Sequence, residues 1–169
     1  MGEVGQQQPA GWRAEAISGF ARSELFEHTF QEGMDLVEET AAYLDGPGRQ
    51  DSKLLSRNAA LAYASESMRL TTRLMQVASW LLVQRAVREG DMAPQSAAGA
   101  GYRLGAEAEM AVAAEALPAP LAALLGRSER LFERVRHLDL RMYVETAADA
   151  APPHPVLSQF ERLKDAFGG

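Results

Sequence analysis

The sequence predicts an all-α protein: a three-helix bundle with a long central helix and flexible N- and C-terminal tails. The chain of 169 residues is rich in alanine and has few Ile, Thr and Tyr residues, a composition that favours helix over strand. Apolar residues recur every three or four positions in three separate segments, and residues 49–89 contain neither Pro nor Gly. We therefore expect one bundle domain over residues 23–147, a flexible segment at 1–22 and a tail at 148–169.

The composition argues against several classes of protein. The chain has no cysteine, which rules out disulfides, thiolate metal sites and thiol nucleophiles. No run of 18 consecutive apolar residues occurs, and the first residues lack a basic region followed by an apolar run, so we expect a cytoplasmic protein without a membrane partner. The formal net charge of −6 argues against nucleic acid as a partner.

The first helix is predicted from Ser23, a residue type favoured at N-caps, to Asp45. The run Asp45-Gly46-Pro47-Gly48 should end it, because Gly and Pro both break helices. The apolar positions that recur at helical spacing along this segment are Phe26, Phe30, Met34, Val37, Ala41 and Leu44.

A second, much longer helix should follow this turn. Asp51 or Ser52 can cap its start, and the segment continues to Glu89, where Gly90 can end it. At about 1.5 Å per residue, such a helix would be a rod of roughly 55 Å. It is therefore predicted to be the spine of the bundle.

Two rows of large apolar residues run along this long helix. We expect neighbouring helices on both sides of it, one against each row. The heptad spacing of one row also permits a coiled-coil-like dimer, but Arg57, Thr71 and Arg85 occupy the companion positions, so the pattern alone does not establish one. The heptad row consists of Leu54, Leu61, Met68, Met75 and Leu82, and the other row of Tyr63, Leu70, Leu74, Val77 and Leu81.

The rest of the chain is predicted to hold one more long helix between less regular segments. Residues 91–119, interrupted by Gly and Pro, should form a mobile connection, with transient helix around 106–116. The third helix is predicted from Pro120 to Glu145, with a broad apolar face. A Pro-rich linker then precedes a short amphipathic segment whose apolar positions are Val156, Phe160, Leu163 and Phe167.

Charge is segregated along the first two helices. Residues 24–48 contain seven acidic residues and no Lys or Arg, whereas residues 49–88 contain seven basic residues against two acidic ones. Two interpretations stay open. The adjacent helices have complementary surfaces that favour their pairing, or the basic stretch is a patch for an acidic partner.

Two surfaces are candidate partner sites. The first is one sector of the long helix, where Trp and Arg would act as interface anchors; in the alternative, Trp80 is covered by residues 91–120 or by the C-terminal segment, and the arginines pair with carboxylates of the first helix. The second is the tail, in which Val156, Phe160, Leu163 and Phe167 either bind a partner or dock on their own bundle. The sector on the long helix consists of Arg69, Arg73, Gln76, Trp80, Val83 and Val87.

Catalytic motifs are absent from the sequence, so we expect no catalytic residues, no cofactor and no metal. Glu24 and His28, and again Glu133 and His137, are four residues apart. The carboxylate-bridged metal bundles instead use Glu-x-x-His pairs three apart together with two further glutamates. A metal-binding bundle enzyme is kept as an alternative function.

One block of the sequence resembles a known family. The strings EGMDLVEETAAYLDGPGR and ESMRLTTRLMQVASWLLVQRAV within residues 30–92, with LFERVRHLDLRMY further on, resemble the alphaproteobacterial family of the regulator of CtrA degradation, RcdA. The resemblance is strong over the first two predicted helices and partial over the third.

This resemblance implies a non-enzymatic adaptor that promotes regulated ClpXP proteolysis of cell-cycle regulators. It implies a homodimeric three-helix bundle in the cytoplasm. Its partners would be ClpXP together with a receiver-domain priming protein, the substrate regulators, and a cyclic-di-GMP-binding protein. The other alternative is a structural interaction protein unrelated to proteolysis.

Overall fold

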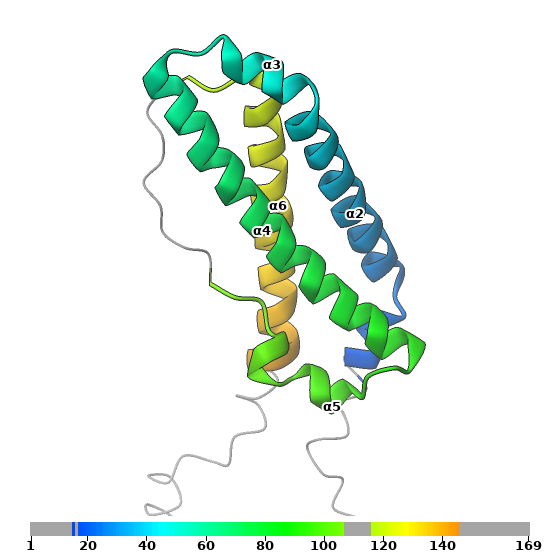
Figure 1. Ribbon diagram of the computed structural model, residues 1–169. Helices are drawn as coiled ribbons and strands as arrows, with labels where there is room; N and C mark the ends of the chain where they lie inside the picture. The colour runs from blue at the N-terminus through cyan, green and yellow to red at the C-terminus, as the bar shows by residue number, and fades with distance from the viewer. Residues whose placement is uncertain (1–14, 16, 107–115, 146–169) are drawn as a thin grey trace, which may run out of the picture.

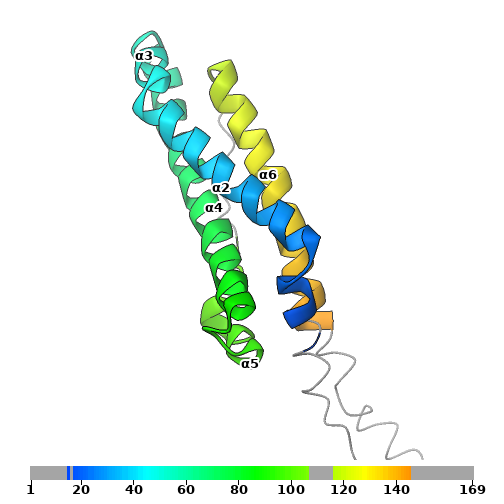
Figure 2. The ribbon, with the colours of Figure 1, turned by 90° about the vertical axis from the view of Figure 1, so that its right-hand side faces the viewer.

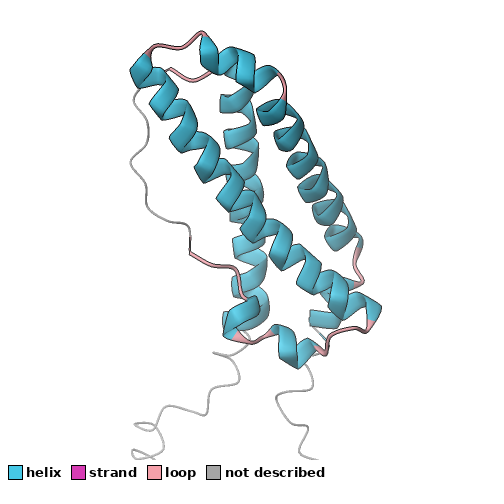
Figure 3. Ribbon diagram, in the orientation of Figure 1, coloured by secondary structure: helices cyan, strands magenta, loops and turns pink. Residues whose placement is uncertain are grey.

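The structure, a computed structural model, describes residues 15, 17–106 and 116–145 (Figure 1). Three long helices form its body, α2 (Glu24–Asp45), α4 (Arg57–Glu89) and α6 (Ala119–Leu140). α4 packs against both α2 and α6, and α2 also packs against α6. Figure 2 shows α2 crossing the other two helices, and Figure 3 shows helices joined by loops with no strand in the described residues. The predicted all-α bundle with a long central helix is confirmed.

Both predicted ends of the first helix are confirmed. Ser23 is the N-cap of α2: its Oγ accepts a hydrogen bond from the Phe26 amide at 3.2 Å and donates one to the Phe20 carbonyl at 2.7 Å. The helix ends at Asp45, and the Gly46 amide bonds back to the Tyr43 carbonyl. Local capping chemistry therefore determines where α2 begins and ends.

The predicted long helix from Asp51 or Ser52 to Glu89 is broken near its start. A short helix, α3 (Pro47–Lys53), turns the chain across the end of the bundle, and α4 begins only at Arg57. Ser56 caps α4 by accepting a hydrogen bond from the Ala59 amide at 3.2 Å. α4 is therefore about 50 Å long rather than 55 Å, with Gly90 in the left-handed region (φ 81°) at its end as predicted.

Residues 17–21 are helical, although they lie in the segment predicted to be flexible. Ile17 and Ala21 are fully buried, and the Phe20 ring lies 5.8 Å from both the Phe26 and the Trp80 rings. Aromatic packing against the bundle thus extends the folded unit to before Ser23. Residues 1–14 and 16 lie outside the described part of the chain.

The connection after α4 is ordered in its first half, contrary to the prediction of a mobile segment. It contains α5 (Pro94–Ala97) and a 3₁₀ turn, η1 (Ala100–Tyr102), and Ala97 is fully buried. We call residues 94–106 the strap. Residues 107–115, which include most of the predicted transient helix, lie outside the described residues. α6 then follows as predicted and continues into a π-helical turn, η2 (Arg141–Glu145).

The core lies where the three long helices meet. One predicted row of α4 is buried there, through Leu70, Leu74, Val77 and Leu81. Leu121, Leu131 and Val135 of α6 and Leu36 of α2 complete the same cluster. None of the described helices is long and apolar enough to cross a bilayer.

Ion pairs join α2 to both neighbouring helices. Since most of them are exposed, each contributes only about 0–1 kcal/mol, and they affect the choice of helix neighbours more than stability. Among the described residues, one of the pairs between long helices joins the acidic segment to the basic one as predicted, and α6 supplies the arginine of the other two. These pairs are Glu27 with Arg88 of α4, and Glu32 with Arg134 and Glu39 with Arg127 of α6.

Gly48 occupies a site at the α2–α3 corner that has no room for a side chain. A Cβ there would lie 2.5 Å from the Tyr63 hydroxyl and 2.7 Å from the Tyr43 carbonyl oxygen. We expect Gly48→Ala to lower the free energy of unfolding by about 1–3 kcal/mol in denaturant titrations. Gly126→Ala, inside α6 with no neighbour closer than 3.5 Å, is the matched control and should raise it by about 0.5–1 kcal/mol. Stabilisation by both substitutions would contradict the close packing at this corner.

Candidate partner-binding surface

The heptad row of α4 is exposed. Leu61, Met68, Met75 and Leu82 have exposed fractions of 64%, 70%, 65% and 51%. We call these four residues the α4 row; Leu54, just before α4, is also exposed. The prediction that a neighbouring helix covers this row is wrong, because α2 and α6 both pack against the opposite side of α4.

The exposed side of α4 itself carries no charge over most of the helix. Between Arg57 and Arg85, a described stretch of about 40 Å, the charged side chains of α4 are turned inward: Glu66 and Arg73 are buried and Arg69 is mostly buried. We call the exposed remainder the uncharged face. It consists of Asn58, Leu61, Ala64, Met68, Thr71, Thr72, Met75, Ser79 and Leu82.

Two hollows flank the α4 row. On the α2 side, a groove of about 290 Å³ lies between Val37 and Leu44 of α2 and Thr71 and Ala78 of α4. On the other side, a cleft of about 720 Å³ lies between α4 and residues 101–105 of the strap. Met75 lines both hollows, so the row is a ridge between an α2-side groove and a strap cleft.

A buried carboxylate holds the strap against the bundle. Asp139 of α6 accepts hydrogen bonds from Trp80 Nε1 of α4 at 2.9 Å and from Arg103 Nε and Nη2 of the strap at 2.8 and 2.6 Å. The Leu104 amide also points to this carboxylate at 3.4 Å. One acidic side chain therefore connects α4, α6 and the strap.

Tyr143 of η2 contacts both Arg103 of the strap and Gln84 of α4. Its ring lies 4.8 Å from the Arg103 guanidinium, and its hydroxyl oxygen accepts a hydrogen bond from Gln84 Nε2 at 2.8 Å. Burial raises the pKa of the Tyr143 phenol above its usual range. The phenol thus stays neutral near physiological pH and places no second negative charge beside Asp139.

This chain is similar to a protein family and to a protein of known structure. The model of the family described as "Protein of unknown function (DUF1465)" matches residues 17–167. The chain belongs to the DUF1465 family. RcdA from Caulobacter crescentus, a protein with a crystal structure, is 70% identical to this chain in sequence. The match covers 75% of this chain and 98% of the RcdA chain, with a TM-score of 0.65. The resemblance to RcdA is therefore confirmed, and no curated protein matches the chain.

In this DUF1465 protein the six residues of the predicted α4 site are mostly enclosed. Arg73, Trp80 and Val87 are buried, whereas Arg69, Gln76 and Val83 are half-buried. Trp80 is enclosed by the Phe20 ring at 5.8 Å and by the Asp139 carboxylate at 2.9 Å. Partner contact through these residues stays a prediction, and Gln76, Trp80 and Val83 are the three that line the strap cleft.

The arginines of this site contact residues of α4 and α6. Arg73 donates a hydrogen bond to Ser128 Oγ of α6 at 2.7 Å and lies 3.6 Å from a Glu129 carboxylate oxygen. Arg69 pairs with Glu66 of its own helix at 3.5 Å. Arg73 thus faces α6, and Arg69 pairs within α4. The tail positions Val156, Phe160, Leu163 and Phe167 lie outside the described residues.

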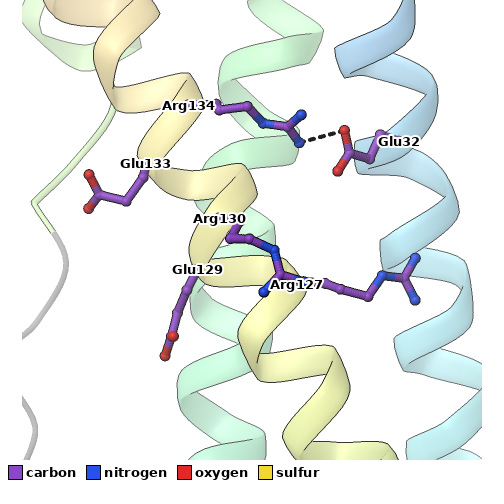
Figure 4. A pocket seen from close by; sticks show the side chains of 6 residues that line it. All are labelled: Glu32, Arg127, Glu129, Arg130, Glu133 and Arg134. Carbon is purple, nitrogen blue, oxygen red and sulfur yellow. Dashed lines mark hydrogen bonds and ion pairs between the residues drawn. The ribbon is translucent and has the colours of Figure 1, made fainter.

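A charged hollow of about 520 Å³ lies between α2 and α6 (Figure 4). Its lining balances three arginines against three glutamates, and Arg134 bonds to Glu32 at 2.5 Å. Such a lining offers no net attraction for an ion of either sign. In the described residues no three His, Asp or Glu side chains come together as metal ligands.

The residues Arg103 and Asp139 were missed by sequence reasoning. The available signal was Asp139 itself, an acidic residue in the middle of an apolar helical face, next to a predicted long helix whose Trp80 needs a hydrogen-bond acceptor. Its partner Arg103 lies in a segment that was predicted to be mobile, so the sequence alone did not indicate the pair.

We expect Asp139→Ala to lower the free energy of unfolding by about 3–5 kcal/mol, because it leaves Trp80 and Arg103 without their buried acceptor. Urea titration measures this loss. Glu133→Ala, which breaks an exposed pair with Arg136 on the same helix, is the control and should change stability by less than about 1 kcal/mol. Equal small effects in both variants would show that Asp139 does not hold the strap.

Proposed function

We propose that this protein is a non-enzymatic adaptor that binds protein partners and promotes regulated ClpXP proteolysis of cell-cycle regulators. The observation that supports this proposal is the exposed apolar α4 row on the uncharged face, in a homologue of RcdA. Large exposed apolar patches on soluble proteins typically mark interaction sites. A protein-binding scaffold therefore accounts for the main unexplained feature of the surface.

The proposed partners are those that the resemblance to RcdA implies. They are ClpXP with a receiver-domain priming protein, the substrate regulators, and a cyclic-di-GMP-binding protein, all acting in the cytoplasm. The bundle supplies a rigid body whose two hollows are preformed, so binding costs little ordering of the scaffold itself. Affinity then depends on how partners fill the hollows beside the α4 row.

We further propose that two copies pair through the α4 row and the α2-side groove. Arg57 and Arg85 mark the two ends of the uncharged face, so a parallel arrangement would place like charges together. An antiparallel pair with Met68 at the two-fold axis places Leu61 of one copy beside Met75 of the other and offsets Arg57 from the partner's Arg85 by about 9 Å along the helix. Such an interface is self-complementary, as a two-fold dimer requires.

The pairing is tested by a charge introduced at its centre. Met68→Glu should reduce the mass measured by light scattering from that of two chains to that of one 18.3 kDa chain, because a carboxylate would be buried at the two-fold axis. Ala123→Glu, which adds the same charge on the exposed side of α6, should leave the mass unchanged. A wild-type chain that is already monomeric would contradict the pairing and leave the adaptor role to be judged separately.

Reconstituted proteolysis tests the adaptor role. With ClpXP and the receiver-domain protein present, addition of the purified chain should speed the degradation of a substrate regulator. Thr72→Glu, a charge on the uncharged face, should reduce this effect several-fold, and Ala123→Glu should not. If the chain neither binds these proteins nor changes the degradation rate, the proposed function is wrong.

A further inference from the structure

The strap cleft has the form of a preformed docking site. Its α4 wall extends from Thr72 to Val83, and its opposite wall is residues 101–105 of the strap, which lie beside α4 in Figure 1. The strap is held in place by the bonds from Arg103 to Asp139, so the cleft needs no rearrangement to stay open. The buried Trp80 forms part of its lining.

The chemistry of the cleft suits an apolar helix face. Among the described residues that line the cleft, Arg103 is the one with a charged side chain, and its guanidinium is already bonded in a fork to Asp139. Met75, Leu82 and Val83 supply apolar surface along the α4 wall. A ligand with apolar side chains along one side and charges along the other would bury the first and leave the second in water.

We propose that this cleft binds residues 156–167 of the protein's own C-terminal segment. In that segment Val156, Phe160, Leu163 and Phe167 fall on one face when projected as a helix, with Glu161 and its charged neighbours on the other. As a helix, residues 156–167 would be roughly 16 Å long, which equals the roughly 16 Å from Thr72 to Val83 along the cleft wall. Apolar pattern and length thus both match the site.

The connectivity of the chain favours this occupant. The described structure ends at Glu145, two residues after Tyr143, whose ring lies against Arg103 at the edge of the cleft. Residues 146–155 can span up to about 33 Å, more than the length of the cleft wall. The segment therefore starts beside its site, and a short tether gives it a high effective concentration there.

Docking of the segment in its own chain would regulate the proposed adaptor, and this consequence rests on the proposed function. A partner that binds Phe160 and Leu163 has to compete with the cleft for the same side chains. The docked segment would also cover the strap-side flank of Met75 and Leu82 and leave the α2-side groove open. Binding of a partner to the tail would then uncover the strap-side flank of the α4 row, and this would link partner binding to the pairing of two copies.

A paramagnetic label tests the docking in the full-length chain. Because the protein has no cysteine, Ser79→Cys places one spin label in the cleft of an isotope-labelled sample. In NMR spectra we expect the spin label to reduce the amide signal intensity of residues 156–167. No such loss should occur when the label is at Ala123→Cys. Leu163→Asp should restore the signals, whereas Ser158→Asp, on the polar side of the segment, should not.

Two results would overturn the proposal. The first is full signal intensity for residues 156–167 with the label at Ser79→Cys. The second is signal loss that appears when the label and the isotopes are on different chains, which would show the segment of a second copy in the cleft. Neither result depends on protease or partner, so failure of the docking is distinct from failure of the adaptor role in the degradation assay.

Discussion

The carboxylate of Asp139 is the interaction on which the arrangement of the bundle depends. It lies inside the protein, where an ionised group without partners would be costly, and it receives hydrogen bonds from an indole and from a forked guanidinium. These donors come from α4 and from the strap, while Asp139 itself belongs to α6. The strap therefore lies beside Trp80 because Arg103 and Trp80 donate to the same buried carboxylate.

The second constraint is that α4 is covered on one side only. α2 and α6 bury Leu70, Val77 and Leu81, and the buried polar groups of α4, such as Arg73 and Gln84, face α6 and the π-helical turn after it. Every charge in the middle of the helix is thus used for internal contacts. The side chains that α4 exposes there are uncharged, and several of them are large and apolar. The outward side of the central helix is therefore suited to bind another protein surface.

Local signals in the sequence predicted the helix ends well. Ser23 and Gly90 act through their own backbone and side-chain chemistry, so their roles are visible without tertiary structure. The break before Arg57 was missed because Ser52 and Ser56 are both acceptable caps, and only the packing of α3 across the bundle end selects the second. The exposure of the α4 row was missed for a related reason. Two apolar rows look alike in a sequence, and the number of neighbouring helices decides which one is buried.

The direction of the helices has a consequence for how the chain is made. α4 and α6 run the same way, so the connection between them must return along the whole bundle before α6 can begin (Figure 1). Trp80 and Asp139 are 59 positions apart, and Gln84 and Tyr143 equally so. During synthesis, α2 and α4 emerge before α6, and the buried polar groups of α4 lack their α6 partners until α6 has left the ribosome. The nascent chain thus passes through a stage in which it resembles a substrate for chaperones and proteases more than a finished scaffold.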